Sequence, residues 1–100
     1  MFRPFGVDGV ALLLVAPGPS LAEGSAAIGR LAPGARFPHH RHLGEETTLV
    51  LEGGLRDEDG REVWRGEELF KAAGTSHDFV VVGHEVCVAA VLAREGVVFG

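Results

Sequence analysis

Short apolar runs separated by glycine and proline recur along the whole chain. Within many runs apolar and polar residues alternate, which is the period of a β-strand with one face toward a core. Turn residues recur about every eight to twelve residues, as they do in β-sandwiches and β-barrels. No window keeps a helical period, because glycine and proline interrupt too often. The pattern predicts an all-β protein with strands over residues 10–15, 25–30, 37–42, 46–51, 55–56, 61–64, 68–71, 77–82, 86–93 and 97–99.

The most apolar run, residues 10–16, has two interpretations. It resembles the apolar part of a signal peptide, but only Arg3 supplies positive charge before it and Asp8 interrupts the approach. It is also too short to span a bilayer. A buried strand is therefore the favoured interpretation, and we expect a cytoplasmic protein with no membrane partner.

Composition and charge narrow the class further. The chain has 100 residues, of which 46% are hydrophobic and 23% charged, which predicts one folded domain spanning residues 1–100. The net charge is −5, and the nine basic residues do not cluster, so we expect no nucleic-acid partner. The single cysteine, Cys87, excludes a disulfide within the chain and favours a buried thiol. The acidic run at residues 57–60 predicts a solvated hairpin tip.

A candidate metal site lies in the middle of the sequence. His40 and His42 share one face of a predicted strand, and Glu46 has the same parity. Gly44 also has this parity and would leave open space beside a metal. Neutral imidazoles with a carboxylate suit Zn, Fe, Mn, Co or Ni. A fourth ligand is expected from a neighbouring strand, where His77 is best placed.

These residues also carry a resemblance to the cupin superfamily. The first cupin motif is matched at every fixed position, by Gly34, His40, His42, Glu46 and Gly53. The second motif is matched only in part, by Gly66, Gly74 and His77, with Ala72 and Val81 in place of the usual Pro and Asn. The resemblance implies a small cupin, a double-stranded β-helix or jelly-roll barrel.

A narrower resemblance is to the cupin domain of the zinc-binding ChrR anti-sigma factors, carried by residues 40–46, 49–53 and 56–60. It implies a divalent metal, most simply zinc with iron, manganese or nickel as alternatives, on His40, His42, Glu46 and His77. It does not imply sigma-factor binding, which those proteins perform through a separate N-terminal helical domain.

Three functions remain open at this point. The first is binding or sensing of a small molecule at the metal, and the second is an iron-dependent dioxygenase acting on a small keto or phenolic compound. The third is a structural metal. No general acid or base is evident besides the ligands, so no catalytic residue is assigned. Because open strand edges are a liability, we also expect a homodimer that uses the N-terminal strand.

Overall fold

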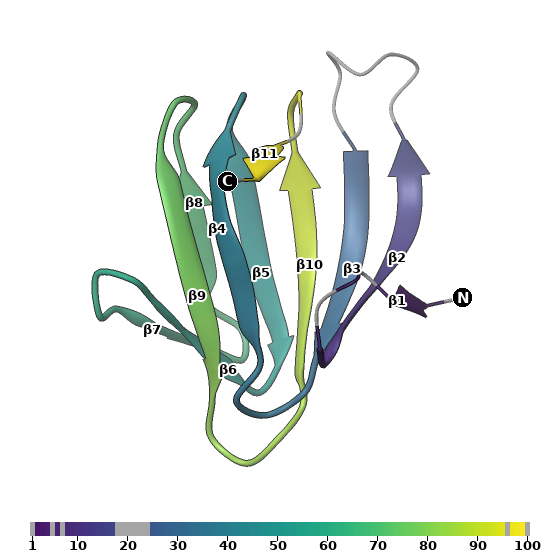
Figure 1. Ribbon diagram of the computed structural model, residues 1–100, viewed down its shortest axis with the longest axis vertical. Coiled ribbons are helices and arrows are strands. Elements are labelled where there is room, and N and C mark those ends of the chain that lie inside the picture. Colours follow the sequence, from purple (N-terminus) through teal and green to yellow (C-terminus); the bar gives the residue numbers. More distant parts are fainter. Residues whose placement is uncertain (1, 5, 7, 18–24, 96, 100) are drawn as a thin grey trace.

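The computed structural model describes residues 2–4, 6, 8–17, 25–95 and 97–99, which contain strands and turns but no helix. All strand pairs are antiparallel, and they build two sheets that face each other as a flattened barrel (Figure 1). The six-stranded sheet has the order β1 (Arg3–Pro4), β2 (Val10–Pro17), β3 (Ser25–Leu31), β10 (Cys87–Ala93), β5 (Glu46–Glu52) and β8 (Glu68–Lys71). The five-stranded sheet has the order β11 (Val97–Phe99), β4 (Arg36–His42), β9 (Ser76–Val82), β6 (Gly54–Asp57) and β7 (Glu62–Trp64).

The structure confirms the all-β class and every predicted strand, with small shifts at the ends. The apolar run that begins at Val10 forms β2 and pairs with β3, so it is a strand of the barrel. Among the described strands, only β1 was not predicted, because a strand of two residues is too short to show an alternation of apolar and polar positions. The connection between β2 and β3, residues 18–24, lies outside the described residues.

A bulge in β4 changes which side chains face the interior. Phe37 pairs with Phe79 and His40 pairs with His77, so β4 holds one more residue than β9 over the same interval. The extra residue reverses the alternation between Phe37 and His40, and both rings face inward although an odd number of positions separates them. Pro38 occupies the bulge, a position where the missing N–H of proline costs no ladder hydrogen bond.

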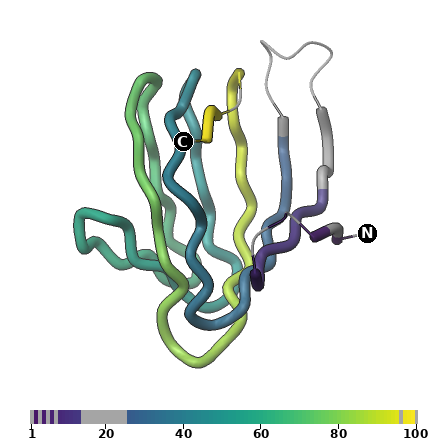
Figure 2. Tube along the Cα trace, viewed as in Figure 1, coloured from purple at the N-terminus to yellow at the C-terminus, as the bar shows by residue number. Residues whose placement is uncertain are grey.

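The apolar core occupies one end of the barrel, where β5 ends and β10 begins. Its buried members come from both sheets and include Val50, Leu55, Val63 and Cys87, none of which is exposed to solvent. Toward the other end, the interior holds buried histidines instead of aliphatic side chains. The histidines gather there because β4 and β9, which are distant in sequence, are paired and lie side by side (Figure 2).

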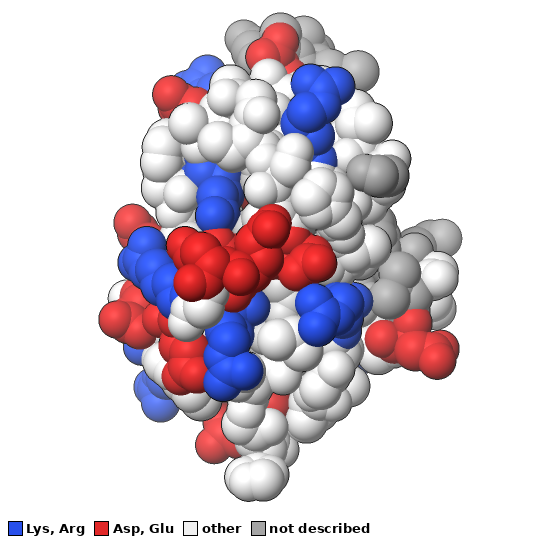
Figure 3. All heavy atoms as spheres, turned by 60° about the vertical axis from the view of Figure 1, so that its left-hand side comes forward, with Lys and Arg blue, Asp and Glu red and all other residues white. Residues whose placement is uncertain are grey.

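The outer surface mixes both signs of charge. On the face shown in Figure 3, acidic side chains gather near the centre and basic side chains lie around them in separate groups. Ion pairs join Arg36 to Asp78 at 3.1 Å and Arg56 to Glu62 at 2.8 Å. Among the described residues, none forms a helix of the length and apolarity that crossing a membrane requires.

Candidate metal centre

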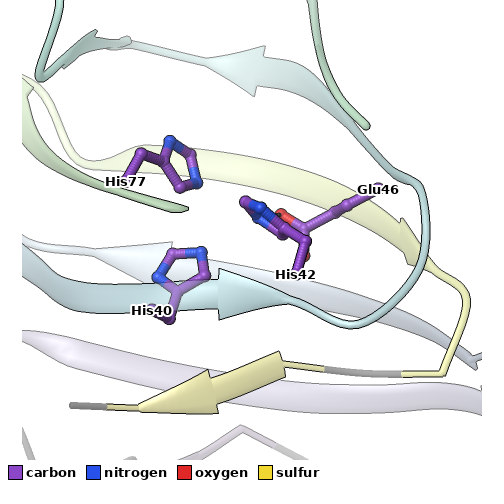
Figure 4. Close-up of side chains that lie close together, drawn as sticks. All are labelled: His40, His42, Glu46 and His77. Carbon is purple, nitrogen blue, oxygen red and sulfur yellow. Dashed lines mark ion pairs between the residues drawn. The ribbon is translucent and has the colours of Figure 1, made fainter. Parts of the chain in front are cut away.

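Three histidines and one glutamate converge inside the barrel from three strands. His40 and His42 come from β4, His77 from the adjacent β9 and Glu46 from β5 on the facing sheet, as Figure 4 shows. One potential ligand atom from each of these side chains lies within 4.8 Å of all the others. The histidines are at most 2% exposed, and the glutamate side chain is 12% exposed. The structure thus brings together all four residues that the sequence selected.

Hydrogen bonds at Nδ1 orient the imidazole rings. The ring of His40 donates to the backbone oxygen of Pro38 at 2.8 Å, which the bulge in β4 brings within reach. The ring of His42 donates to the backbone oxygen of Thr75 at 3.0 Å. A carbonyl oxygen can only accept, so each of these Nδ1 atoms carries the hydrogen. In a neutral ring the lone pair then lies on Nε2, which faces the cluster.

Two polar atoms of the cluster have no hydrogen-bond partner among the described residues. Nε2 of His42 and Nε2 of His77 are buried and form no hydrogen bond. Burial lowers the pKa of all three histidines, which favours their neutral form. Nε2 of His42 lies 3.5 Å from Oε1 of Glu46, and burial raises the pKa of that carboxyl. Lone pairs and a carboxylate that face one another repel, and a divalent transition metal between them would remove that repulsion, so this donor set fits such an ion.

Asp57 is a site residue that the sequence interpretation missed. It was expected at a solvated hairpin tip, but it ends β6 and is 2% exposed. Its Oδ1 accepts the Nδ1 hydrogen of His77 at 2.6 Å, and its Oδ2 accepts a hydrogen bond from Lys71 at 2.5 Å. Burial alone would raise the pKa of Asp57, yet the hydrogen bonds from Lys71 and His77 hold this pKa below its usual value. The carboxylate therefore stays ionised.

An aromatic wall stands beside the histidines. Phe37 stacks on Phe79 with ring centroids 5.1 Å apart, and its edge meets the ring of His40 at the same distance. Phe99 of β11 lies 5.8 Å from His40 and is 45% exposed. The wall gives the site one apolar side that extends toward solvent, where a flat or apolar group can pack.

Gly44, Arg36 and His84 lie outside the cluster. The space expected beside a metal at Gly44 does not exist, because a Cβ there would stand 2.5 Å from the backbone oxygen of Arg94. Arg36 faces outward and pairs with Asp78, since the bulge reverses its parity relative to His40. His84 is exposed, as expected for a turn residue.

An antiparallel two-sheet barrel that gathers three histidines and a glutamate inside one end defines a cupin. The model of the family described as "ChrR Cupin-like domain" matches residues 2–95. The chain therefore belongs to this family. A search among curated protein sequences gives no match.

Solved structures agree with this assignment. The complex of Rhodobacter sphaeroides SigE with the anti-sigma ChrR contains a similar chain, with a TM-score of 0.83 and 26% identity. That match covers 94% of this chain and 49% of the other, so the present chain spans about half of that protein. The polyketide cyclase RemF from Streptomyces resistomycificus has a TM-score of 0.74 and 26% identity over 92% of this chain and 69% of its own. KdgF from Halomonas sp. has a TM-score of 0.78 at 19% identity, over 94% and 86%, and shows the fold alone.

Proposed function

We propose that this chain is a metal-binding cupin that holds one divalent ion and uses it to bind or sense a small molecule. The proposed ligands are His40, His42, Glu46 and His77. The observation that carries the proposal is the pair of buried Nε2 atoms without a partner, which face a carboxylate inside the barrel. A buried polar atom without a partner costs free energy, and an ion at the centre of the cluster removes that cost.

Zinc is the ion we favour, with iron, manganese and nickel as alternatives. Three imidazole nitrogens and one carboxylate oxygen are typical zinc donors, and zinc can expand from four to five ligands when a small molecule coordinates it. The hydrogen bonds at Nδ1 hold the rings in the tautomer that a metal ligand needs. Metals with six coordination positions would keep two of them for water or a small molecule.

Metal content provides the direct test. We expect about one equivalent of metal per chain by elemental analysis of the wild-type protein, since the donor set serves a single ion. The double variant His40→Ala, His42→Ala should lose it. The variant His84→Ala is the matched control, because that histidine is exposed and lies in a turn. A double variant with full metal content would show that the site assignment is wrong.

The aromatic wall supports a ligand with a flat or apolar part. Phe37 and Phe79 form a stacked pair next to two of the proposed ligands, and such a surface favours a ring or a short apolar chain. Titration of cobalt-loaded protein with phenols and small carboxylates should change the visible absorption of the metal. Phe79→Ala should weaken the response to ring compounds more than the response to acetate. Equal responses would show that the wall does not contact the ligand.

The second candidate is an iron-dependent dioxygenase acting on a small keto or phenolic compound. It is favoured by the donor set, because three histidines and one glutamate on iron leave positions for a substrate. Resemblance does not decide between binding and catalysis. A chain from an anti-sigma complex and an enzyme, a polyketide cyclase, match this chain at the same 26% identity. Oxygen consumption by iron-loaded protein with a diketone or a phenol would favour catalysis. Tight zinc binding without turnover would favour binding.

We also propose that the chain forms a homodimer through the outer face of the six-stranded sheet. Leu13, Ile28, Ala90 and Leu49 lie in one row across β2, β3, β10 and β5 on this face. Leu92, in the next row, is 61% exposed. An apolar sheet face of this kind is typical of a surface that packs against another protein.

A further inference from the structure

Asp57 connects the two sheets at the level of the histidine cluster. Its Oδ1 accepts the hydrogen of Nδ1 of His77 at 2.6 Å, within the five-stranded sheet. Its Oδ2 accepts a hydrogen bond at 2.5 Å from Lys71, which belongs to β8 of the six-stranded sheet. Both carboxylate oxygens thus have a donor, as a buried carboxylate requires.

The Asp57–Lys71 pair lies next to two of the proposed metal ligands, with Asp57 bonded to His77 and Lys71 opposite Glu46. Lys71 stands opposite Glu46 in the pairing of β8 with β5, so the pair neighbours two of the four proposed metal ligands. The side chain of Asp57 is fully buried and that of Lys71 is 19% exposed. Solvent and salt therefore screen this ion pair much less than they screen a surface pair.

His77 differs from the other two histidines in its partner. His40 and His42 donate to neutral backbone oxygens, whereas His77 donates to a carboxylate. A carboxylate attracts the Nδ1 hydrogen more strongly than a carbonyl does, which leaves more electron density on Nε2. The positive charge of Lys71 keeps the carboxylate ionised and fixes its second oxygen, so the ring of His77 has one preferred orientation.

We propose that Asp57 and Lys71 are a positioning pair that fixes His77 in the Nδ1–H tautomer with Nε2 toward the cluster, and strengthens it as a donor. The donor-strength part rests on the proposed metal binding, whereas the tautomer part concerns the metal-free protein. Neither residue is one of the four proposed ligands, so each would act on a bound ion only through His77. Asp57 and Lys71 would affect how tightly His77 binds the ion.

Zinc affinity, measured by competition with a chelator, tests the first part. Asp57→Asn keeps the shape of the side chain but removes its charge, and we expect affinity to fall about 10- to 100-fold. Lys71→Met keeps the apolar stem and should produce a smaller loss in the same direction. The control is Glu62→Gln, which removes an exposed ion pair with Arg56 in the same β6–β7 hairpin that carries Asp57 and should leave affinity unchanged.

The tautomer of His77 tests the second part without any metal. In the metal-free wild-type protein, ¹⁵N chemical shifts should report a single Nδ1–H tautomer for this ring. In Asp57→Asn the two tautomers should mix, because an amide can accept through oxygen or donate through nitrogen. A wild type that binds no metal would refute the proposed function, and the tautomer result would still decide the positioning role.

Unchanged affinity together with an unchanged tautomer in Asp57→Asn would overturn the positioning role. Urea unfolding of each variant separates a loss of fold from a loss of positioning. If Asp57→Asn does not fold, Lys71→Met carries the test, and its overturning result is wild-type affinity with the wild-type tautomer of His77.

Discussion

Gly44 lies directly against the backbone of Arg94, and a Cβ built on it would stand 2.5 Å from the Arg94 carbonyl oxygen. Gly44 belongs to the turn that joins β4 to β5, between the proposed ligands His42 and Glu46. Side-chain atoms do not approach a backbone oxygen so closely, so one of the two segments must move in Gly44→Ala. We expect this variant to be destabilised by about 1–3 kcal/mol in urea unfolding. Because the shift falls between two ligands, metal affinity should fall as well.

The matched control for this variant is Gly29→Ala in β3. A Cβ there would meet its nearest neighbour, a Leu31 methyl, at 3.4 Å, which is ordinary van der Waals contact. Its φ also lies outside the left-handed region that favours glycine. The control should stay within about 1 kcal/mol of the wild type. Equal stability losses in Gly29→Ala and Gly44→Ala would contradict the steric explanation.

Sequence reasoning reached most of the site because the signal is local. His40, His42 and Glu46 share parity across one strand and the start of the next, and that parity survives in the structure. Asp57 could not be found in this way. Its role depends on β6 lying beside β9, and an acidic run followed by glycine reads as a solvated turn wherever it occurs.

The bulge in β4 marks a second limit of sequence reasoning. Simple alternation along β4 would put Arg36 on the same face as His40. The extra residue at Pro38 and His39 instead leaves Arg36 at the surface and Phe37 in the interior. A proline in a strand indicates an edge or a bulge without telling which. The aromatic wall beside the site follows from the bulge, which brings Phe37 to the interior beside Phe79.

The buried histidines predict an acid-sensitive metal-free protein. The pKa of each of His40, His42 and His77 is lowered from 6.5 by burial, so below pH 6.5 the unfolded chain binds protons that the folded chain does not. Stability is then lost as the pH falls, by up to about 1.4 kcal/mol per pH unit for each proton. Urea unfolding of chelator-treated protein should give a lower midpoint at pH 5.5 than at pH 7.5.

Glu46 has the opposite effect on how stability changes with pH. Burial raises its pKa from 4.5, so the folded state takes up a proton before the unfolded state as the pH falls, and this adds stability. The variant Glu46→Gln removes this contribution and should steepen the loss of stability on acidification. A midpoint that does not change between pH 7.5 and 5.5 in either protein would show that the histidines are not held neutral.

Cys87 should be chemically inert in the folded protein. The residue is fully buried in the apolar core, and burial raises the pKa of its thiol to about 11. At pH 8 only about one thiol in a thousand is then ionised, and the thiolate is the reactive form. Iodoacetamide should leave the native protein unmodified by mass spectrometry and should alkylate it once in urea. Rapid alkylation without denaturant would indicate that this end of the barrel opens.

The proposed dimer predicts the effect of a charge on the outer face of the six-stranded sheet. Leu92 is 61% exposed and lies in one row with Thr47 and with Phe70, which is 55% exposed. Leu92→Asp places a carboxylate in this apolar area, and burying it without a partner in an interface is unfavourable. Analytical ultracentrifugation should show a dimer for the wild type and a monomer for Leu92→Asp. The control Val98→Asp alters an equally apolar, exposed position on β11 of the other sheet and should remain a dimer. A monomeric wild type at high protein concentration, or a dimer that survives Leu92→Asp, would rule out this interface.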